Sequence, residues 1–438
     1  KLHHTHVIFQ WDNIPKADEY QIQIYINSEL NNPILDTIVL SNYYYDKTSL
    51  NWSNNYGWRV RSIQSDENQD WTNNQVFEIG PQKFEDTEII HTSNLDLIQD
   101  GYFLSGFSNW TGGSLQFNGS CVIDKFGNEI WNDGDLNVML NHINKFGQMF
   151  GGQDVEWTYT SGIEFDMNEN VIWREFDGYN LDQHELIQLP NGNYLGLKHV
   201  FKEGPVPIGN WTQQFQNIGY IADGITNEIN WVGQEIIEMN PITNEVVWSW
   251  NPYDHITFDE YDSLGGTWNV VINLSRNSYD WLHSNAIFFD EENSEIYISQ
   301  RHISRITKIS YPSGEVIWEM GPNHELLNYG ENHICSDLGF SWQHNIQLLN
   351  NGNLLLFDNG NLSHHLQETS TAHTRILEIV INDNYECEIE WEFVLPHELW
   401  TPGSGSVQSL KNGNYLIAAG TDNIVEISQE KEILGKQT

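Results

Sequence analysis

Residues 346–357 read "IQLLNNGNLLLF", two short apolar runs separated by an Asn-Asn-Gly-Asn step. Asn and Gly tolerate positive φ, so such a step favours a tight turn between antiparallel strands. Similar half-units are "LIQDGYFLSG" (97–106), "LIQLPNGNYLGL" (186–197) and "VQSLKNGNYLIAAG" (407–420), and "AIFFDEENSEIYIS" (286–299) is a variant with a longer turn. This repetition predicts a fold built from β-hairpins.

A second half-unit is a hairpin whose last strand ends in Trp. It occurs as "CVIDKFGNEIW" (121–131), "IEFDMNENVIW" (163–173), "IIEMNPITNEVVW" (236–248), "ITKISYPSGEVIW" (306–318) and "ILEIVINDNYECEIEW" (376–391). A last copy, "IVEISQEKEIL" (424–434), is cut short, so this hairpin is missing its end or closes differently. Two hairpins in succession make one four-stranded unit, and such units stack radially or linearly along a chain.

Six such units predict an all-β fold in which residues 83–438 form a six-bladed β-propeller. A β-helix or a pair of β-sandwiches is the alternative. The terminal Trp residues are unevenly spaced along the chain, so long loops must connect the units. Loops held by a rigid scaffold commonly carry function, and we therefore expect the site on them.

The first eighty or so residues have a different pattern. "VIFQWDNIPKADEYQIQIY" (7–25) ends in alternating apolar and polar residues, and "NNYGWRVRSI" (54–63) repeats the alternation. Short alternating strands separated by turn signals predict a small antiparallel sandwich over residues 1–82. Its Trp, Pro and Tyr spacing resembles a fibronectin type III-like module, which is usually a spacer or docking surface, and we assign no chemistry to it.

The composition restricts the partners of this 438-residue chain. Lys and Arg number 19 against 61 Asp and Glu, a formal net charge of −42. Such a chain repels nucleic acid and anionic lipid surfaces, so we expect neither as a partner. No apolar run has the length of a membrane helix, and we expect no membrane insertion. Any anion that binds must be attracted by a local cationic pocket.

The cysteines are Cys121, Cys335 and Cys387, too few for a disulfide scaffold. At most one bridge forms, and the sequence leaves the pairing open. The acidity and the Asn-x-Ser/Thr sequons support an exported protein that is periplasmic, on the cell surface or secreted. Acidic loops such as "FDEENSE" (289–295) leave a structural calcium ion possible.

Three histidines occupy equivalent places in successive units. His184, His283 and His344 each come just before the apolar inner strand of their unit. In a propeller these strands line the central channel, so the three side chains converge. Arg301 and His302 end the strand after His283. Side chains alternate faces along a strand, so we expect only one of this pair to face the channel.

Three interpretations of these residues compete. Each histidine is a polar residue satisfied at a strand end, or the histidines bind a metal such as zinc or copper, or the pocket binds and transfers an anionic group. Arg301 disfavours a metal because a fixed cation repels a dication. A guanidinium fork suits a tetrahedral oxyanion, so the third interpretation fits best.

Several motifs together carry a family resemblance. These are "DWLHSNAIFFDEE" (280–292), "SQRHIS" (299–304), "SGEVIWEMGP" (313–322), "FSWQHN" (340–345) and "LLLFDNGN" (354–361). They resemble the bacterial aryl-sulfate sulfotransferases that do not use a nucleotide sulfate donor. That family places a small β-sandwich ahead of a six-bladed propeller, the same layout that the repeats indicate.

The resemblance implies a ping-pong transfer of a sulfuryl group from a phenolic sulfate ester to a phenol. By motif, His344 looks like the nucleophile and Arg301 like the arginine that holds the sulfate oxygens. His283 and Asn285 match sulfate-site residues, and His184 matches the remaining site histidine, with His184 or His283 handling the proton. The implied partners are an aryl sulfate and a phenol, with no cofactor and no metal.

The sequence also departs from the family. The segment 319–343 is short and has one cysteine, Cys335, where the family carries a disulfide-closed loop, so donor preference is open. Trp268, Tyr279, Trp281, Trp342 and Trp400 are candidates for a pocket lining, although core packing is the more common role for each. A propeller that only binds sulfated ligands, and a structural surface protein, are the alternative functions. Homo-oligomer formation is left open.

Overall fold

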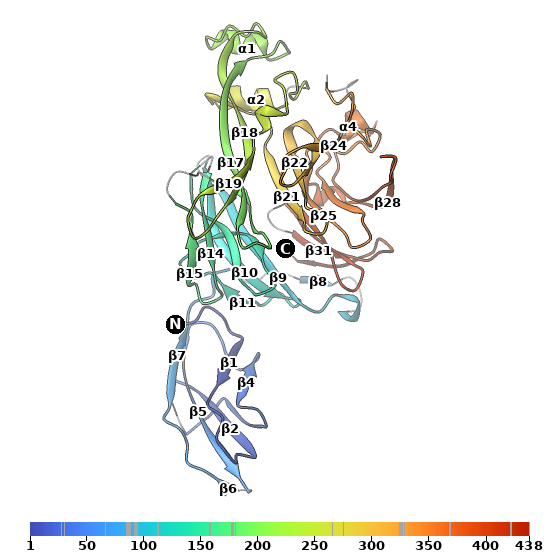
Figure 1. Ribbon diagram of the computed structural model, residues 1–438. Coiled ribbons are helices and arrows are strands. Elements are labelled where there is room, and N and C mark those ends of the chain that lie inside the picture. The colour runs from blue at the N-terminus through green and yellow to red at the C-terminus, as the bar shows by residue number, and fades with distance from the viewer. Residues whose placement is uncertain are drawn as a thin grey trace.

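The computed structural model describes residues 1–27, 29, 31–65, 67–84, 89–91, 95–111, 114–156, 159–176, 179, 181–264, 266–274, 276–323, 327, 329–367, 369–420 and 423–437. The fold is all-β and propeller-like, as predicted, with many antiparallel sheets. Strands β1 to β7 lie together at one end of the molecule, and the remaining sheets form the larger body (Figure 1).

The N-terminal strands make two sheets over one small core. They are β1 (Val7–Gln10), β2 (Glu19–Ile26), β3 (Leu35–Val39), β4 (Tyr43–Asp46), β5 (Asn54–Gln64), β6 (Glu67–Asn68) and β7 (Gln75–Ile79). One sheet pairs β1 with β4, and the other has the order β3-β2-β5-β6, with β7 also on β5. Tyr20, Ile22 and Ile24 are buried on one face of β2, as the alternation predicted, but Gln23 and Tyr25 of the opposite face are buried as well.

The larger body begins with a three-stranded sheet and a nine-stranded sheet, and the latter consists of two four-stranded groups and β20 (Ser278–Asp280). The first contains β9 (Tyr102–Thr111), β10 (Ser114–Asp124) and β11 (Glu129–Asn132). The two groups of the second are β12 (Met139–Ile143), β13 (Met149–Glu156), β14 (Tyr159–Phe165) and β15 (Val171–Arg174), then β16 (Leu181–Gln188), β17 (Tyr194–Pro205), β18 (Asn227–Met239) and β19 (Val246–Trp250). One pair, Thr160 with Leu181, joins these two groups, and β20 runs parallel to β18.

The second half of the body contains three more meanders. They are β21 (Ser284–Asp290), β22 (Glu295–Gln300), β23 (Arg305–Ser310) and β24 (Val316–Met320); β25 (His344–Leu348), β26 (Leu354–Asp358), β27 (Arg375–Ile381) and β28 (Cys387–Val394); and β29 (Ser406–Ser409), β30 (Tyr415–Ala419), β31 (Asn423–Ile427) and β32 (Ile433–Gln437). The five hairpins predicted to end in Trp are confirmed as antiparallel pairs. The truncated last hairpin closes differently, because β8 (Ile89–His91) pairs with β32.

One predicted hairpin is wrong. In "LIQDGYFLSG" (97–106) the first part forms no strand: a short 3-10 helix, η1 (Leu95–Leu97), leads into β9. The backbone amide of Gln99 donates to Glu426 Oε1 of the last meander at 2.9 Å. The segment therefore satisfies its backbone against a neighbouring sheet and has no strand of its own to pair with.

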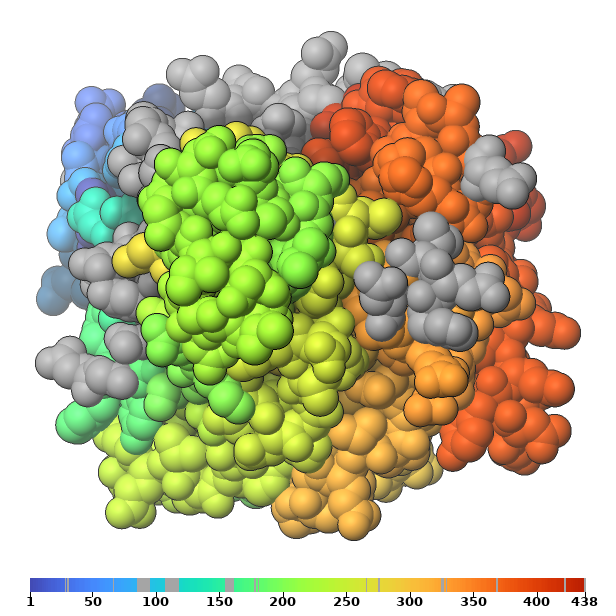
Figure 2. All heavy atoms as spheres, turned by 90° about the horizontal axis from the view of Figure 1, so that it is seen from above, coloured from blue at the N-terminus to red at the C-terminus, as the bar shows by residue number. Residues whose placement is uncertain are grey.

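The helices are short and lie outside the sheets. They are α1 (Thr212–Asn217), α2 (Gly266–Asn273) and α4 (Ser363–Leu366), with 3-10 turns η2 (Pro252–Asp254), η3 (Arg301–Ile303) and η4 (His397–Leu399). The arm β17–β18 carries α1 at its end and projects from the upper face (Figures 1 and 2). Among the described helices, none combines the length and the apolar character that crossing a bilayer requires.

The Asn residues of the predicted turns have a second role between sheets. Asn353 Nδ2 donates to Glu378 Oε1 at 2.6 Å, and Tyr415 of the next meander donates to Glu378 Oε2 at 2.5 Å. Glu238 accepts in the same way from Tyr311 of its neighbour, at 2.5 Å. Each of these buried carboxylates is satisfied by two sheets at once, which holds adjacent sheets in register.

The structure settles the disulfide question. Cys335, in the segment after β24, is bonded to Cys387 at the start of β28, and Cys121 is a buried free thiol. The bridge therefore ties the segment that precedes His344 to the outer strand of the next sheet. The pairing was open from the sequence because the partners are 52 residues apart.

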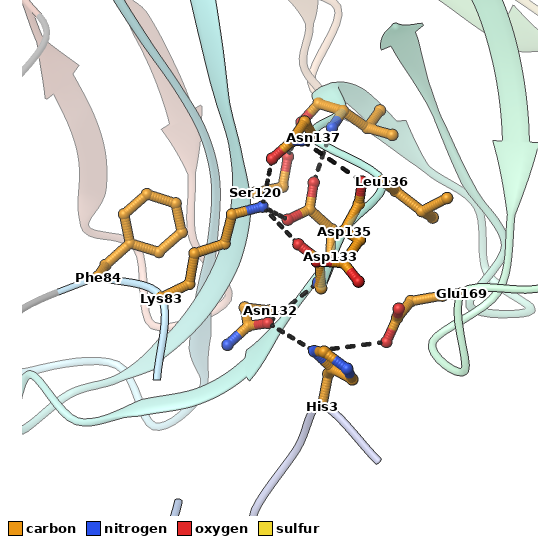
Figure 3. A network of polar contacts seen from close by, with 12 residues as sticks. His3, Lys83, Phe84, Ser120, Asn132, Asp133, Asp135, Leu136, Asn137 and Glu169 are labelled. Carbon is orange, nitrogen blue, oxygen red and sulfur yellow. Dashed lines mark hydrogen bonds and ion pairs between the residues drawn. The ribbon is translucent and has the colours of Figure 1, made fainter. Parts of the chain in front are cut away.

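A buried ion pair lies where the N-terminal strands meet the larger body. Lys83 Nζ contacts Asp133 Oδ1 at 2.5 Å, Gly134 O at 2.8 Å and Asn137 Oδ1 at 2.9 Å, and His3 joins this network through Asn132 (Figure 3). Asp133 is fully buried. Burial raises its pKa, and the Lys83 ammonium opposes that rise.

We expect Lys83→Met to lower the free energy of unfolding by about 3 kcal/mol, because Asp133 then stays buried without its countercharge. Lys125→Met is the control: its partner Asp100 is 86% exposed, so solvent screens the pair and the urea midpoint should hardly change. Urea unfolding of the two variants measures both. Equal midpoint shifts would contradict the assignment of Lys83 as a buried structural cation.

Candidate active site

Four of the five site residues predicted from the sequence lie on three neighbouring inner strands or immediately beside them. His184 lies within β16, His283 immediately precedes β21, Asn285 lies within β21, and His344 begins β25. β21 packs against both β16 and β25. The ring centroids of His184 and His283 are 5.1 Å apart, and His344 interacts electrostatically with both. The structure therefore brings the three histidines together, as the sequence predicted.

The prediction that Arg301 and His302 point to opposite faces is wrong. The strand β22 ends at Gln300, and Arg301–Ile303 form the 3-10 turn η3. Ser304, in the left-handed region at φ 50°, ends this turn. The strand period does not apply within a turn, so both side chains reach the site. Arg301 Nη1 lies 2.6 Å from His302 Nε2.

Arg301 is a half-buried cation without a carboxylate partner among the described residues. Its Nη2 donates to Pro402 O at 3.0 Å, its guanidinium carbon lies 4.4 Å from the centre of the Trp342 ring, and its buried Nε has no hydrogen-bond partner. Within the described part of the chain it forms no ion pair. Burial lowers its pKa to about 10, and only the more distant Asp280 opposes this. Such a group is stabilised when an anion binds.

His302 reaches the site together with Arg301, whereas only one of the two was expected there from the sequence. Its Nδ1 donates to the backbone oxygen of Asp280 at 2.7 Å, which leaves Nε2 to accept from Arg301. Both bonds require the neutral ring. Burial lowers its pKa well below the usual range, in keeping with that state. The ring therefore fixes the direction of the guanidinium.

Asp280 also holds His283. Its Oδ2 lies 2.6 Å from His283 Nδ1, so the other ring nitrogen, Nε2, is directed to the site. Burial raises the pKa of Asp280, but His283 and His302 outweigh this and lower it. Burial lowers the pKa of His283, and Arg301 and His184 add to that effect against Asp280.

His344 is held in one tautomer. Its Nδ1 donates to Asn359 Oδ1 at 2.7 Å, and Asn359 Nδ2 donates to Thr401 O and Ser404 O at 2.7 and 2.8 Å. The amide orientation is thereby fixed, and the lone pair of His344 lies on Nε2. Burial, then Arg301, lowers the pKa of His344 well below its usual range. Nε2 accepts a hydrogen bond from the Ser404 amide at 3.2 Å.

Asn285 links the first strand of one sheet to the residue before His344. Its Nδ2 donates to Gln343 O at 2.9 Å, while its buried Oδ1 has no partner. Gln343 Nε2 in turn donates to Ser299 Oγ at 3.1 Å and Arg305 O at 2.9 Å. The position of His344 is therefore set by groups from the neighbouring sheet.

Strained backbone gathers at this site. His283, Trp342, Asn345 and Ser404 all have positive φ, between 47° and 60°. Such conformations are costly for residues other than glycine and persist where the surrounding structure imposes them. Their concentration around His344 and Arg301 is typical of a functional site.

The aromatic candidates separate into two groups. Trp268, Tyr279 and Trp281 are fully buried in the largest core cluster, where Trp268 stacks on Tyr279 with ring centroids 3.6 Å apart. Trp400 is 39% exposed. Trp342 alone of the five contacts site residues, Arg301 and His302.

A metal ion does not suit this group of side chains. Asp280, His283 and His302 present ligand atoms within 4.8 Å of one another. His302, however, already uses both ring nitrogens, and the Arg301 guanidinium is at 2.6 Å from one of them. A dication at this place would meet a fixed cation.

Residues 115–436, more than half of the chain, match the family model described as Arylsulfotransferase (ASST). The chain belongs to the arylsulfotransferase family. This confirms the resemblance drawn from the motifs, and it supports a sulfotransferase, with aryl sulfates and phenols as fitting substrates, at the level of the family.

Solved structures give weak matches. A protein of unknown function from Bacteroides caccae has 12% identity and a TM-score of 0.42 over 77% of this chain and 93% of its own. A catalytically inactive virginiamycin B lyase from Staphylococcus aureus, solved with quinupristin, has 9% identity and a TM-score of 0.39 over 79% and 86%. Neither similarity supports an inference about activity. The comparison with curated proteins gives no match.

Proposed function

We propose that this arylsulfotransferase moves a sulfuryl group from an aryl sulfate to a phenol through a sulfohistidine on His344. One observation supports this most strongly. Arg301, a half-buried guanidinium without a carboxylate partner among the described residues, lies near the neutral imidazole of His344, whose lone pair is on Nε2. The pair offers an anion-binding group and a nucleophile in one place.

In the first half-reaction His344 Nε2 gives up the hydrogen bond that it accepts from the Ser404 amide and attacks sulfur, and the bond from sulfur to the phenolic oxygen breaks. Sulfuryl transfer resembles phosphoryl transfer, with a loose transition state and negative charge on the peripheral oxygens. Arg301 and Asn285 are the proposed contacts of those oxygens. Asn359 Oδ1, which accepts the hydrogen bond from His344 Nδ1, stabilises the positive charge that the ring gains on sulfation.

In the second half-reaction a phenol takes the place of the first product and attacks the same sulfur. The bond from sulfur to Nε2 breaks, and His344 returns to its neutral form. A proton must reach the leaving phenolate and must later leave the incoming phenol. His184 and His283 are the two imidazoles available for this step. The proposed reaction uses no nucleotide donor, cofactor or metal.

The proposed architecture has two domains. Residues 1–82 form the fibronectin type III-like sandwich, and residues 83–438 form a propeller of six blades, for which the nine-stranded sheet counts as two blades and each of the other four sheets of the larger body as one. Export to the periplasm, cell surface or medium, a structural calcium ion and a homo-oligomer stay predictions from the sequence.

The test is a search for the covalent intermediate. We expect that mixing the protein with para-nitrophenyl sulfate in the absence of acceptor, followed by rapid quenching in base, gives one added sulfuryl group on the peptide that contains His344. Intact-mass and peptide-mass measurements locate it. Phenol release without any adduct, or an adduct on another residue, would contradict the proposal.

A further inference from the structure

Asp182 is a buried carboxylate held between two imidazoles. It lies in β16, two residues before His184, and is 7% exposed. Its Oδ1 accepts from His184 Nδ1 at 2.5 Å and from the His184 backbone amide at 2.9 Å, and its Oδ2 accepts from His199 Nε2 on β17. Burial opposes ionisation, but His184 and His199 outweigh it and lower the pKa of Asp182 well below its usual range.

These contacts fix the tautomer of His184. An ionised carboxylate only accepts, so Nδ1 of His184 must carry hydrogen. Its other nitrogen, Nε2, is then the one available to a ligand, on the ring that lies 5.1 Å from His283. A carboxylate behind an imidazole orients the ring and stabilises its protonated form.

The site has a second pair of the same kind, and the two differ. Asp280 also contacts an imidazole, that of His283, but its backbone oxygen holds His302 and the cationic Arg301 lies close by. His199, by contrast, donates to Asp182 from a second strand. The charged and titratable groups around His184 are Asp182, Glu185, His199, Asp280, His283, Arg301 and His344, and burial raises the pKa of Glu185 to about 8.

We propose that Asp182, held by His199, is the positioning residue that makes His184 the proton-transferring group, and that His283 serves as a neutral hydrogen-bonding group. This inference rests on the proposed function and decides between the two histidines that it left open. The electrostatics agree: burial disfavours the cation of His184, but Asp182 outweighs burial and raises the pKa of His184. The pKa values of His283, His302 and His344 are lowered.

The proton is conserved over both half-reactions. When the phenolate leaves sulfur, the Nε2 proton of the His184 cation passes to its oxygen, and His184 becomes neutral. When the acceptor phenol attacks the sulfohistidine, its proton passes to His184 Nε2, which restores the cation. Asp182 stays ionised throughout, and neither step needs another reagent.

The test compares Asp182→Asn with Asp280→Asn on two donors. With phenyl sulfate, whose phenolate needs protonation, we expect Asp182→Asn to lower kcat/KM about 100-fold. With para-nitrophenyl sulfate, whose phenolate leaves more readily unprotonated, the loss should stay below about 5-fold. Asp280→Asn should not show this dependence on the leaving group, because His283 is not the proton donor.

The pH profile gives a second readout. A raised pKa means that His184 holds its proton to higher pH, so kcat/KM for phenyl sulfate falls on the basic side as that proton is lost. Asp182→Asn should move this basic limb to lower pH, since the group that raises the pKa is gone. A titration of the histidine rings of the full chain, followed by NMR without substrate, measures the same pKa shift independently of turnover.

His199 offers a finer control. His199→Gln keeps a donor for Asp182 Oδ2, so its kcat/KM with phenyl sulfate should stay near that of the unmodified protein. His199→Leu removes the donor, so it should lose activity with phenyl sulfate as Asp182→Asn does. A leaving-group effect in Asp280→Asn but not in Asp182→Asn would overturn the assignment, as would an unshifted His184 titration. An absence of any adduct or turnover in the unmodified protein would instead refute the proposed function itself.

Discussion

Replacing His344 with Ala is expected to lower sulfuryl transfer by at least about 10⁴-fold, because the variant has no nucleophile for the covalent route. The effect should be in kcat, and the phenol burst that precedes acceptor-dependent turnover should disappear. Stopped-flow measurement of phenol release with and without acceptor determines both. Binding of the sulfate ester should persist, since Arg301 is intact.

The structure suggests a rescue for this variant. His344 is 6% exposed and its removal leaves a cavity between Asn359 and the Ser404 amide. Free imidazole is expected to restore part of the transfer, because it supplies the missing nitrogen. His365→Ala, at an exposed position of α4, is the matched control and should keep full activity. Full activity in His344→Ala would refute the nucleophile assignment.

Replacing Arg301 with Met is expected to cost about 10³-fold in kcat/KM without loss of stability. The guanidinium is proposed to hold the charge that develops on the sulfuryl oxygens, a contribution of this order for a preorganised donor. Arg301→Lys should recover only a small part, because an ammonium lacks the planar fork. Steady-state kinetics on para-nitrophenyl sulfate measure the losses.

The free energy of unfolding distinguishes a functional arginine, Arg301, from a structural one, Arg305. Arg301 is a half-buried cation with no ion pair among the described residues, so Met at this position removes part of a desolvation cost. Arg305, 1% exposed, is paired with Glu260 and Glu319, the latter at 2.8 Å. Arg305→Met is therefore expected to lower the free energy of unfolding by about 3 kcal/mol, whereas Arg301→Met leaves it unchanged or higher.

Ligand binding completes the comparison. An unreactive sulfate analogue should raise the Tm of the unmodified protein and of Arg305→Met, but not that of Arg301→Met. If Arg301→Met unfolds as readily as Arg305→Met and still binds the analogue, Arg301 is a structural residue and the anion-binding proposal fails.

Short segments of the sequence were enough to predict much of the fold. The Asn-Gly and Pro-Ser-Gly steps predicted the hairpins, and the alternation in "DEYQIQIY" (18–25) predicted which face of β2 is buried. Turn chemistry and strand period act over a few residues, so they can be recognised without the tertiary structure. The segment 97–106 failed because its backbone bonds with Glu426, far along the chain.

For the site, the sequence by itself determined which three histidines are brought together: the repeat placed His184, His283 and His344 in or beside neighbouring inner strands. Only the tertiary structure decided how they are held. Asn359 behind His344, His199 behind Asp182, and Pro402 O on Arg301 come from separate strands and loops. Hydrogen-bond partners depend on distance and direction in space, and loops of irregular length hide both from any local pattern.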